Sequence, residues 1–293
     1  MAMAQYSSYA AHLIQRLKLI EQDMMRLLDL STVLRRVDDP YSGVLIIAPD
    51  YYWGQPDDKQ RMLQMKLKDS FSDWSEHFNL LFSNATESDL HQIEETQTFV
   101  NEWIEKGTVW SLSPNMEDNK RTFKSRIKVF FSLLQMLVDS AHQSVILIPD
   151  TNALIKTPDP VDYIKVAGQS DFQFVILPTI LAELDHLKIA HRDATFRQKV
   201  ESIITRIKGW RNQGSLLAGV TVNKTIKVRT IAGEPNFDKT LHWLRESNND
   251  DRIIASVLEF QRSSPASTVI IVTGDINLQN KAEAANLPFS ELP

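Results

Sequence analysis

Apolar residues in the first half of the chain recur every three or four positions, which is the period of an amphipathic helix. Four such stretches predict helices over about residues 13–27, 63–81, 87–106 and 123–141. Thr86 is expected to cap the third helix at its N-terminus, and Gly107 is expected to stop it. The short apolar run Val44–Ala48 could form a strand or the buried part of a helix.

The pattern changes after Ser144, where runs rich in β-branched residues alternate with helical segments. The expected strands are Val145–Ile148, Phe174–Leu177, Val220–Val228 and Val269–Val272, and the last strand could continue through residues 288–293. Such alternation predicts an α/β fold with a parallel sheet flanked by helices. We therefore expect a mainly helical domain over residues 1–142, with a regulatory, oligomerising or substrate-positioning role, followed by an α/β domain over residues 143–293.

Composition narrows the classes of protein that the chain can belong to. The 293 residues include no cysteine, which excludes disulfides, thiolate zinc sites and cysteine nucleophiles. No apolar run approaches the roughly 20 residues that a membrane span needs, and the first residues lack the pattern of a secretory signal. We therefore expect a cytoplasmic protein with no membrane contact. The net charge of −5 does not indicate a nucleic-acid binder, but binding depends on local patches of charge.

Four acidic residues stand where a parallel α/β domain can build a metal site. Asp150 and Asp275 follow predicted strands, while Glu183 and Asp251 lie on, or at the start of, neighbouring helices. Converging carboxylates repel one another unless a hard divalent cation holds them together. Three of the acids also have an ordinary interpretation: Asp150 could be a helix N-cap, Asp251 a residue of a first helical turn, and Glu183 a solvated side chain.

Neighbouring residues refine this site. Pro149 is expected to end the strand ladder just before Asp150, because proline has no N–H to donate. Asp250 is expected to cap the helix that carries Asp251. Asp185 would point away from Glu183 on the same helix, so an auxiliary or solvated role is expected for it.

These segments, in this order, resemble the PIN-domain ribonucleases over about residues 144–293. The motifs that carry the resemblance are Pro149–Asn152, Glu183–Lys188, Asn248–Ile254 and Thr273–Ala282. The match is closest to the larger PIN domains, such as that of the nonsense-mediated-decay endonuclease. Gly274, Ile276 and His186 depart from residues that are common in the family.

The resemblance implies a site and a reaction. Asp150, Glu183, Asp251 and Asp275 would be the catalytic, metal-binding acids, with Asn152 and Thr273 as polar helpers. It implies an endoribonuclease that uses Mg²⁺ or Mn²⁺ to hydrolyse single-stranded RNA, leaving a 3′-hydroxyl and a 5′-phosphate.

The RNA backbone requires cationic side chains. Residues 184–214 carry seven Lys or Arg residues against three acids, Lys188 and Arg192 among the seven. Arg252 and Lys281 lie near the acids in the sequence and could meet phosphate.

Other functions remain open from the sequence. They are a non-catalytic PIN scaffold that binds RNA or protein, a structure-specific DNA nuclease, and a toxin or defence effector restrained by the helical half. The apolar stripe from Leu13 to Leu27 could dimerise or bind a regulatory partner helix, or it could be internal core.

Overall fold

The computed structural model describes residues 6–36, 48–139 and 144–292. Its internal contacts divide the chain into two compact units. Residues 10–137 form a helical unit, whereas residues 138–293 and the first nine residues form the second unit. Most of the short run predicted as a strand or helix at Val44–Ala48 lies outside the described residues.

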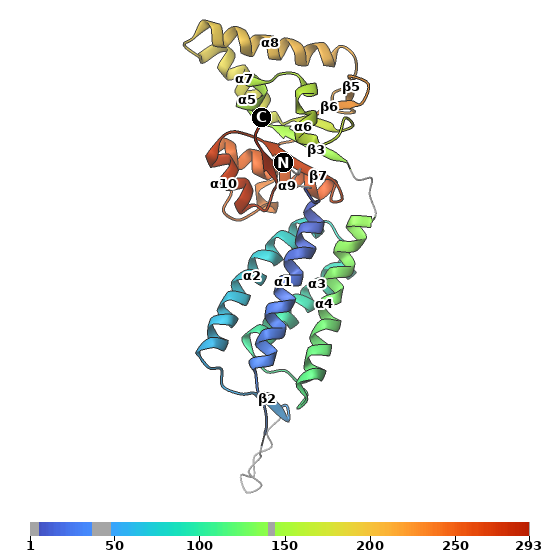
Figure 1. The fold of residues 1–293 in the computed structure, drawn as a ribbon, viewed down its shortest axis with the longest axis vertical. Helices are drawn as coiled ribbons and strands as arrows, with labels where there is room; N and C mark the ends of the chain where they lie inside the picture. The colour runs from blue at the N-terminus through green and yellow to red at the C-terminus, as the bar shows by residue number, and fades with distance from the viewer. Residues whose placement is uncertain (1–5, 37–47, 140–143, 293) are drawn as a thin grey trace. The chain divides into compact units, whose positions relative to one another are not determined.

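The helical unit contains the helices that the apolar pattern predicts, running alongside one another (Figure 1). Its elements are α1 (Tyr9–Leu30), β1 (Val33–Arg35), β2 (Tyr51–Trp53), α2 (Asp58–Phe82), α3 (Glu87–Glu105) and α4 (Met116–Asp139). Thr86 caps α3 as expected, but Lys106 rather than Gly107 takes the left-handed conformation at its end. Helix α4 begins about two turns before the predicted position, because an Asn119 network with Ser113 organises the chain around its first turn.

Aromatic side chains fill the centre of this unit. Trp74 stacks on Phe71 and Phe78 and also contacts Phe130, and its indole N–H donates to the Leu13 carbonyl at 3.0 Å. The stripe of α1 is buried in the same core, comprising Leu13, Leu17, Ile20, Met24 and Leu27. This stripe is therefore internal core and not a surface for a partner helix.

The second unit is built on a largely parallel sheet of six strands among the described residues. The strands are β3 (Val145–Pro149), β4 (Gln173–Ile176), β5 (Val220–Val222), β6 (Ile226–Thr230), β7 (Thr268–Val272) and β8 (Phe289–Ser290). They lie in the order β5-β6-β4-β3-β7-β8, and only β5 runs antiparallel to its neighbour. The α/β class predicted from the sequence is confirmed.

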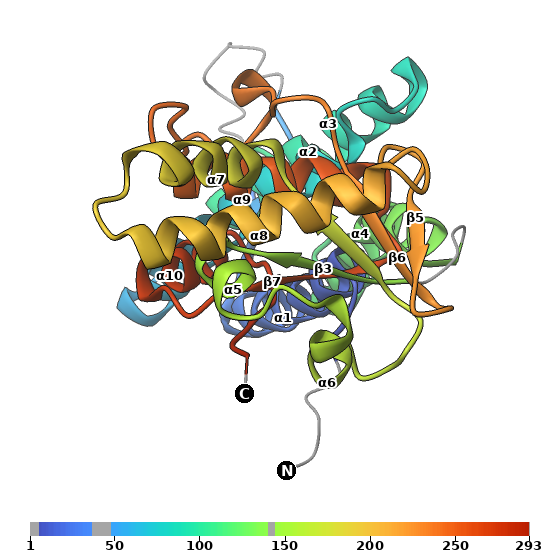
Figure 2. The same cartoon turned by 90° about the horizontal axis from the view of Figure 1, so that it is seen from above.

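Helices and short 3₁₀ turns connect these strands. They are α5 (Thr151–Lys156), η1 (Pro160–Tyr163), α6 (Ile164–Ala167), α7 (Pro178–Ala190), α8 (Ala194–Arg211), η2 (Phe237–Lys239), α9 (Asn249–Ser263) and α10 (Ile276–Ala284). Helices α7 and α8 lie side by side as an antiparallel pair (Figure 2). Helix α9 contacts both α7 and α10, which matters for the site below.

Two local strand predictions were wrong and one is confirmed. The single strand expected over Val220–Val228 is a hairpin, because Asn223 and Lys224 adopt positive φ angles of 46° and 69° and reverse the chain. The prediction for Pro149 is confirmed: β3 ends there, its last ladder pair is with Val272, and the N–H of Asp150 then donates to the Val272 carbonyl at 2.9 Å. The strand pattern of residues 288–293 is a separate short strand, β8, parallel to β7.

Candidate functional site

Three of the predicted acids follow neighbouring parallel strands. Asp150 comes directly after β3, Asp275 comes three residues after β7, and Glu183 lies in α7, which begins two residues after β4. From β3 the chain crosses to β4 on one side, and it later returns to β7 on the other side. This reversal defines a topological switch point between β3 and β7, where open parallel sheets bind their ligands.

The Thr273 hydroxyl connects two of these acids. It donates to Asp150 Oδ2 and accepts the backbone N–H of Asp275 at 2.9 Å. The other Asp150 oxygen accepts the N–H of Ala153 at 2.6 Å, so Asp150 is also the N-cap of α5. Asp150 is only 5% exposed and Thr273 is fully buried. Asp150 is therefore the N-cap of α5, and this cap bond uses only one of its two carboxylate oxygens.

Glu183 contacts the same region through Thr151, a residue that the sequence analysis did not identify. Its Oε2 accepts the hydroxyl of buried Thr151 at 2.6 Å. Thr151 directly follows Asp150, so this contact brings α7 to the end of β3. No sequence signal marked Thr151, because its importance depends on the packing of α7 against α5.

The electrostatics of Asp150 reflect its burial and two nearby carboxylates. Burial raises the pKa of Asp150, and the hydrogen bonds from Thr273 and Ala153 oppose that effect. The negative charges of Asp275 and Glu183 raise the pKa of Asp150 further. Both carboxylates therefore lie near enough to act on Asp150, and we call Asp150, Glu183 and Asp275 the acidic triad.

Asp251 is buried in the first turn of α9 and has different partners. Its Oδ2 accepts the N–H of Arg245 at 3.0 Å, and its Oδ1 lies 2.8 Å from Lys281 Nζ. Asn248 caps α9 by accepting the N–H of Asp251 at 3.2 Å, so the prediction that Asp250 is the cap was wrong. Asn248 occupies the cap because α9 begins at residue 249, one position before Asp250.

Lys281 connects α10 to the first turn of α9. Besides Asp251, it contacts Asn248 Oδ1 at 2.9 Å and Asp250 Oδ2 at 3.3 Å. Burial acts to lower the pKa of Lys281, but the hydrogen bonds and charges of Asp251 and Asp250 outweigh it and leave that pKa raised. Sequence reasoning expected Lys281 to meet phosphate and missed this pairing, which requires α9 and α10 to be adjacent.

The remaining predicted polar residues are more exposed. Asn152 and Asp185 are solvent-exposed on α5 and α7. Lys188 pairs with Glu201 at 3.4 Å and Arg252 pairs with Glu234 at 2.8 Å, while Arg192 is exposed between α7 and α8.

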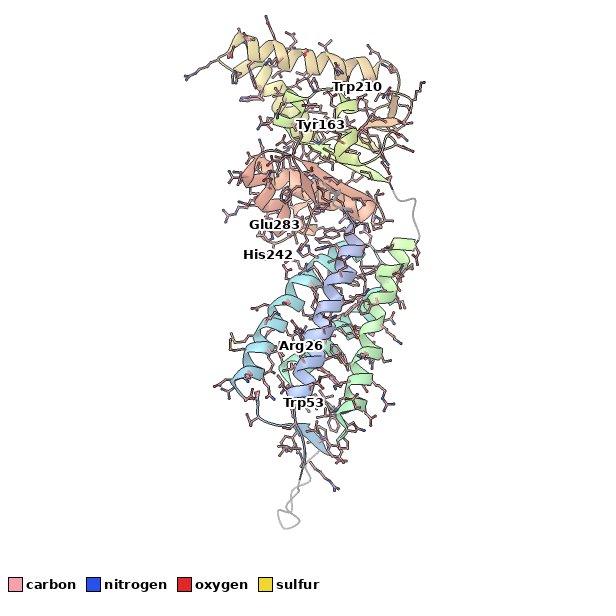
Figure 3. The ribbon with its side chains drawn as sticks, in the orientation of Figure 1. Arg26, Trp53, Tyr163, Trp210, His242 and Glu283 are labelled. Carbon is pink, nitrogen blue, oxygen red and sulfur yellow. The ribbon has the colours of Figure 1, made fainter. Side chains whose placement is uncertain are left out.

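Buried aromatic residues support the region. Tyr163 lies in the interior of the second unit, where its hydroxyl donates to the Thr157 carbonyl at 2.9 Å (Figure 3). Burial raises the pKa of Tyr163, and the charge of Asp150 adds to this rise. Trp210 of α8 is buried as well, so it is not available to stack on a base.

The acidic triad has the right ligand chemistry for a divalent cation, but its side chains are not close enough together to hold one. Its donors are carboxylate oxygens, the ligands that Mg²⁺ and Mn²⁺ prefer, and neighbouring hydroxyls and N–H groups orient all three side chains directly. Across residues 6–36, 48–139 and 144–292, no three His, Asp or Glu side chains are near enough together to hold a metal ion. A cation would therefore draw the triad side chains closer.

An α/β domain with carboxylates gathered at the ends of its central parallel strands defines a class of site used for cation-assisted chemistry. Residues 147–292 match the family model of the PIN domain. The C-terminal half of this chain is therefore a PIN domain, and members of that family are generally nucleases. A search of curated proteins gave no match. Within the described residues, no helix has the length and apolar character to span a membrane.

Proposed function

We propose that this protein is an endoribonuclease that hydrolyses phosphodiester bonds of single-stranded RNA with Mg²⁺ or Mn²⁺. The observation that carries the proposal is the position of Asp150, Asp275 and Glu183 at the switch point of a PIN-domain sheet, held there by the hydroxyls of Thr273 and Thr151. Three like charges at one edge of a sheet are unfavourable unless a cation compensates them.

The acidic triad would hold the cation, and Asp251 is the fourth acid of the site. A divalent ion bound there supplies a water molecule of lowered pKa and neutralises charge on the phosphate. Thr273 orients Asp150 through its hydroxyl, and Thr151 orients Glu183 in the same way. Asp275 is held as the N-cap of α10, where its Oδ1 accepts the N–H of Asn277 at 2.8 Å.

Single-stranded RNA is the proposed substrate because exposed cations lie on the helix pair that carries Glu183. They are Arg192, Lys199, Lys208 and Arg211. Such residues contact the phosphate backbone without reading sequence. The lack of cysteine is compatible with work in the reducing cytoplasm.

The test is a cleavage assay with the full chain, labelled single-stranded RNA and Mn²⁺, repeated with EDTA. Asp150→Asn should lower the cleavage rate by about 100-fold or more, because it removes a ligand charge. Asp185→Asn is the matched control: it removes an exposed carboxylate two residues from Glu183 and should leave the rate within about twofold. Equal rates for Asp150→Asn and the wild type would refute the assignment.

A second candidate is a PIN scaffold that binds RNA without cutting it. The pairing of Asp251 with Lys281 favours this alternative, since it neutralises one of the four acids. Retained RNA binding with no Mn²⁺-dependent product would support the scaffold. Preferential cleavage of flap or hairpin DNA would instead support a structure-specific DNA nuclease.

The role of the helical unit is a separate proposal. A regulatory partner, a homo-oligomer or restraint of a toxin-like nuclease would each have to use its exposed surface, since the α1 stripe is buried. Light scattering of the full chain would detect an oligomer directly.

A further inference from the structure

The Lys281 ammonium contacts the start of α9 through two hydrogen bonds and an ion pair. It has three protons to donate, and it meets three oxygen atoms: Asn248 Oδ1 at 2.9 Å, Asp250 Oδ2 at 3.3 Å and Asp251 Oδ1 at 2.8 Å. A lysine that serves only as a phosphate contact would keep its ammonium in solvent. This one instead bridges α10 to the first turn of α9.

Asp251 depends on that lysine. Its side chain is only 8% exposed, so an unpaired charge there would be costly. The N–H of Arg245 satisfies one oxygen at 3.0 Å, and Lys281 is the cation beside the other. The carboxylate is therefore already neutralised by a residue of the same chain.

The pairing with Lys281 separates Asp251 from the other three acids. The carboxylates that raise the pKa of Asp150 are Asp275 and Glu183. Asp251 instead belongs to the cluster around Lys281. A cation placed at the acidic triad thus meets three carboxylates, and the fourth is held by an ammonium group.

We propose that Lys281 is a positioning residue that serves as the internal counter-ion of Asp251, so that a divalent cation can recruit Asp251 only by displacing Lys281. This inference rests on the proposed function, because it concerns the same metal site. Lysine at this position keeps Asp251 buried and ordered without a metal, and it lowers the affinity of the site for the cation. Removing the ammonium leaves Asp250 and Asp251 as uncompensated charges that attract a dication.

The test measures Mn²⁺ binding to the full chain without RNA, by calorimetry and by the electron paramagnetic resonance signal of free Mn²⁺. Lys281→Met keeps most of the aliphatic stem and removes the charge. It should bind Mn²⁺ about tenfold more tightly than the wild type, or bind one additional ion. Lys66→Met is the matched control, because Lys66 forms a 2.8 Å ion pair with Asp23 in the helical unit, so its loss should leave Mn²⁺ affinity unchanged.

Two further variants separate the counter-ion role from a general effect of charge. Lys281→Met combined with Asp251→Asn should return to the wild-type affinity, since the carboxylate that gained affinity is gone. Asp251→Asn alone should change Mn²⁺ affinity by less than about twofold, whereas Asp150→Asn should weaken it by about tenfold or more.

Folding of the variants is checked by thermal unfolding in EDTA and in Mn²⁺. A destabilised Lys281→Met should gain more stability from Mn²⁺ than the wild type, because tighter binding stabilises the folded state more. Lys281→Gln, which keeps a donor for Asn248, is the second variant if Lys281→Met does not fold.

The proposal is overturned if both Lys281 variants bind Mn²⁺ no better than the wild type, including no measurable binding to any of them. It is also overturned if Asp251→Asn alone weakens binding as much as Asp150→Asn. Failure of the nuclease proposal is a different result: RNA would stay intact while the Mn²⁺ affinities still follow the predicted order.

Discussion

Thr273 donates its hydroxyl proton to the carboxylate of Asp150, a residue 123 positions earlier in the chain. The same hydroxyl oxygen accepts the N–H of Asp275, so one buried side chain links the ends of β3 and β7. The position of Asp150 is thus fixed by a neighbouring strand as well as by its own helix.

Thr273→Val should weaken both folding and function, because valine keeps the shape of threonine but has no hydroxyl. Asp150 would lose a donor and the N–H of Asp275 would lose its acceptor, at a cost of about 1–3 kcal/mol in unfolding free energy. The cleavage rate should fall by about tenfold or more, as for the loss of other groups that orient a metal ligand. Urea unfolding and the RNA assay measure the two effects. Thr273→Ser retains the hydroxyl and should recover most of both; a serine variant as impaired as valine would contradict the explanation.

Asp150→Asn should stabilise the metal-free protein at neutral pH. Burial raises the pKa of Asp150 above the ordinary 3.8, so the native state holds this proton to a higher pH than the unfolded chain does. The stabilising contribution of the neutral carboxyl is therefore complete below about pH 3.8 and is lost as pH rises through the raised pKa. Asparagine is also a good N-cap, so α5 should be preserved.

Thermal unfolding in EDTA from pH 4 to 8 tests this expectation. The advantage of Asp150→Asn should grow with pH. Added Mn²⁺ should stabilise the wild type more than the variant, because the variant lacks a ligand charge. A lower stability of Asp150→Asn at pH 7 in EDTA would show that burial does not dominate the energetics of this carboxylate.

His77 should make the helical unit sensitive to acid. It is 1% exposed, and burial lowers its pKa from 6.5 to about 4 despite the carboxylate of Asp73 at 3.8 Å. Between these values the unfolded chain binds the proton and the native state does not. Stability is therefore complete above about pH 6.5 and is lost as pH falls toward 4, with a slope of at most about 1.4 kcal/mol per pH unit.

His77→Gln should flatten this part of the stability curve, measured by urea unfolding between pH 4 and 7. The control is His91→Gln, because the side chain of His91 is 71% exposed and its removal should leave the slope unchanged. An identical slope in wild type and His77→Gln would assign the acid sensitivity to another group.

Lys224→Gly should stabilise the β5–β6 hairpin. Lys224 has a φ of 69°, in the left-handed region that glycine enters without a steric penalty from Cβ. The substitution should raise the unfolding free energy by about 1 kcal/mol, measured by urea unfolding. Lys224→Ala removes the same charge but retains a Cβ, so it should give no such gain. Equal stabilisation by alanine and glycine would indicate an effect of charge instead of backbone conformation.

The elements that sequence reasoning predicted well are those with a strong local pattern. The stripe of α1 and the buried strands β3 and β7 have regular spacing or continuous apolar runs, so their assignment needs no tertiary information. The β5–β6 hairpin was missed because Asn223 and Lys224 lack the glycine that normally marks a tight turn. Its apolar residues on both sides then appeared to be a single strand.

The same distinction applies to the acidic site: some of its residues could be predicted from a local pattern, and others depend on tertiary packing. Asp150 and Asp275 could be placed because each lies within three residues of the end of a strand, and the parallel order of the sheet brings their positions together. The partners of Asp251 could not be predicted, since Lys281 reaches it only through the packing of α10 against α9. Thr151 was missed for a related reason: its hydroxyl matters only because α7 returns beside α5.

The first nine residues of the chain group with the C-terminal unit, and Tyr6 donates its hydroxyl proton to the carbonyl of Phe289 at 3.3 Å. The peptide chain consequently leaves the PIN unit and comes back to it, which tethers residues 10–137 at both of their ends. Proteolysis inside that stretch would leave one fragment joined covalently to residues 138–293, whereas the other fragment would carry Tyr6 and be held to the PIN unit only by noncovalent contacts. A shortened protein starting at residue 143 would lack Tyr6 as well as residues 10–137.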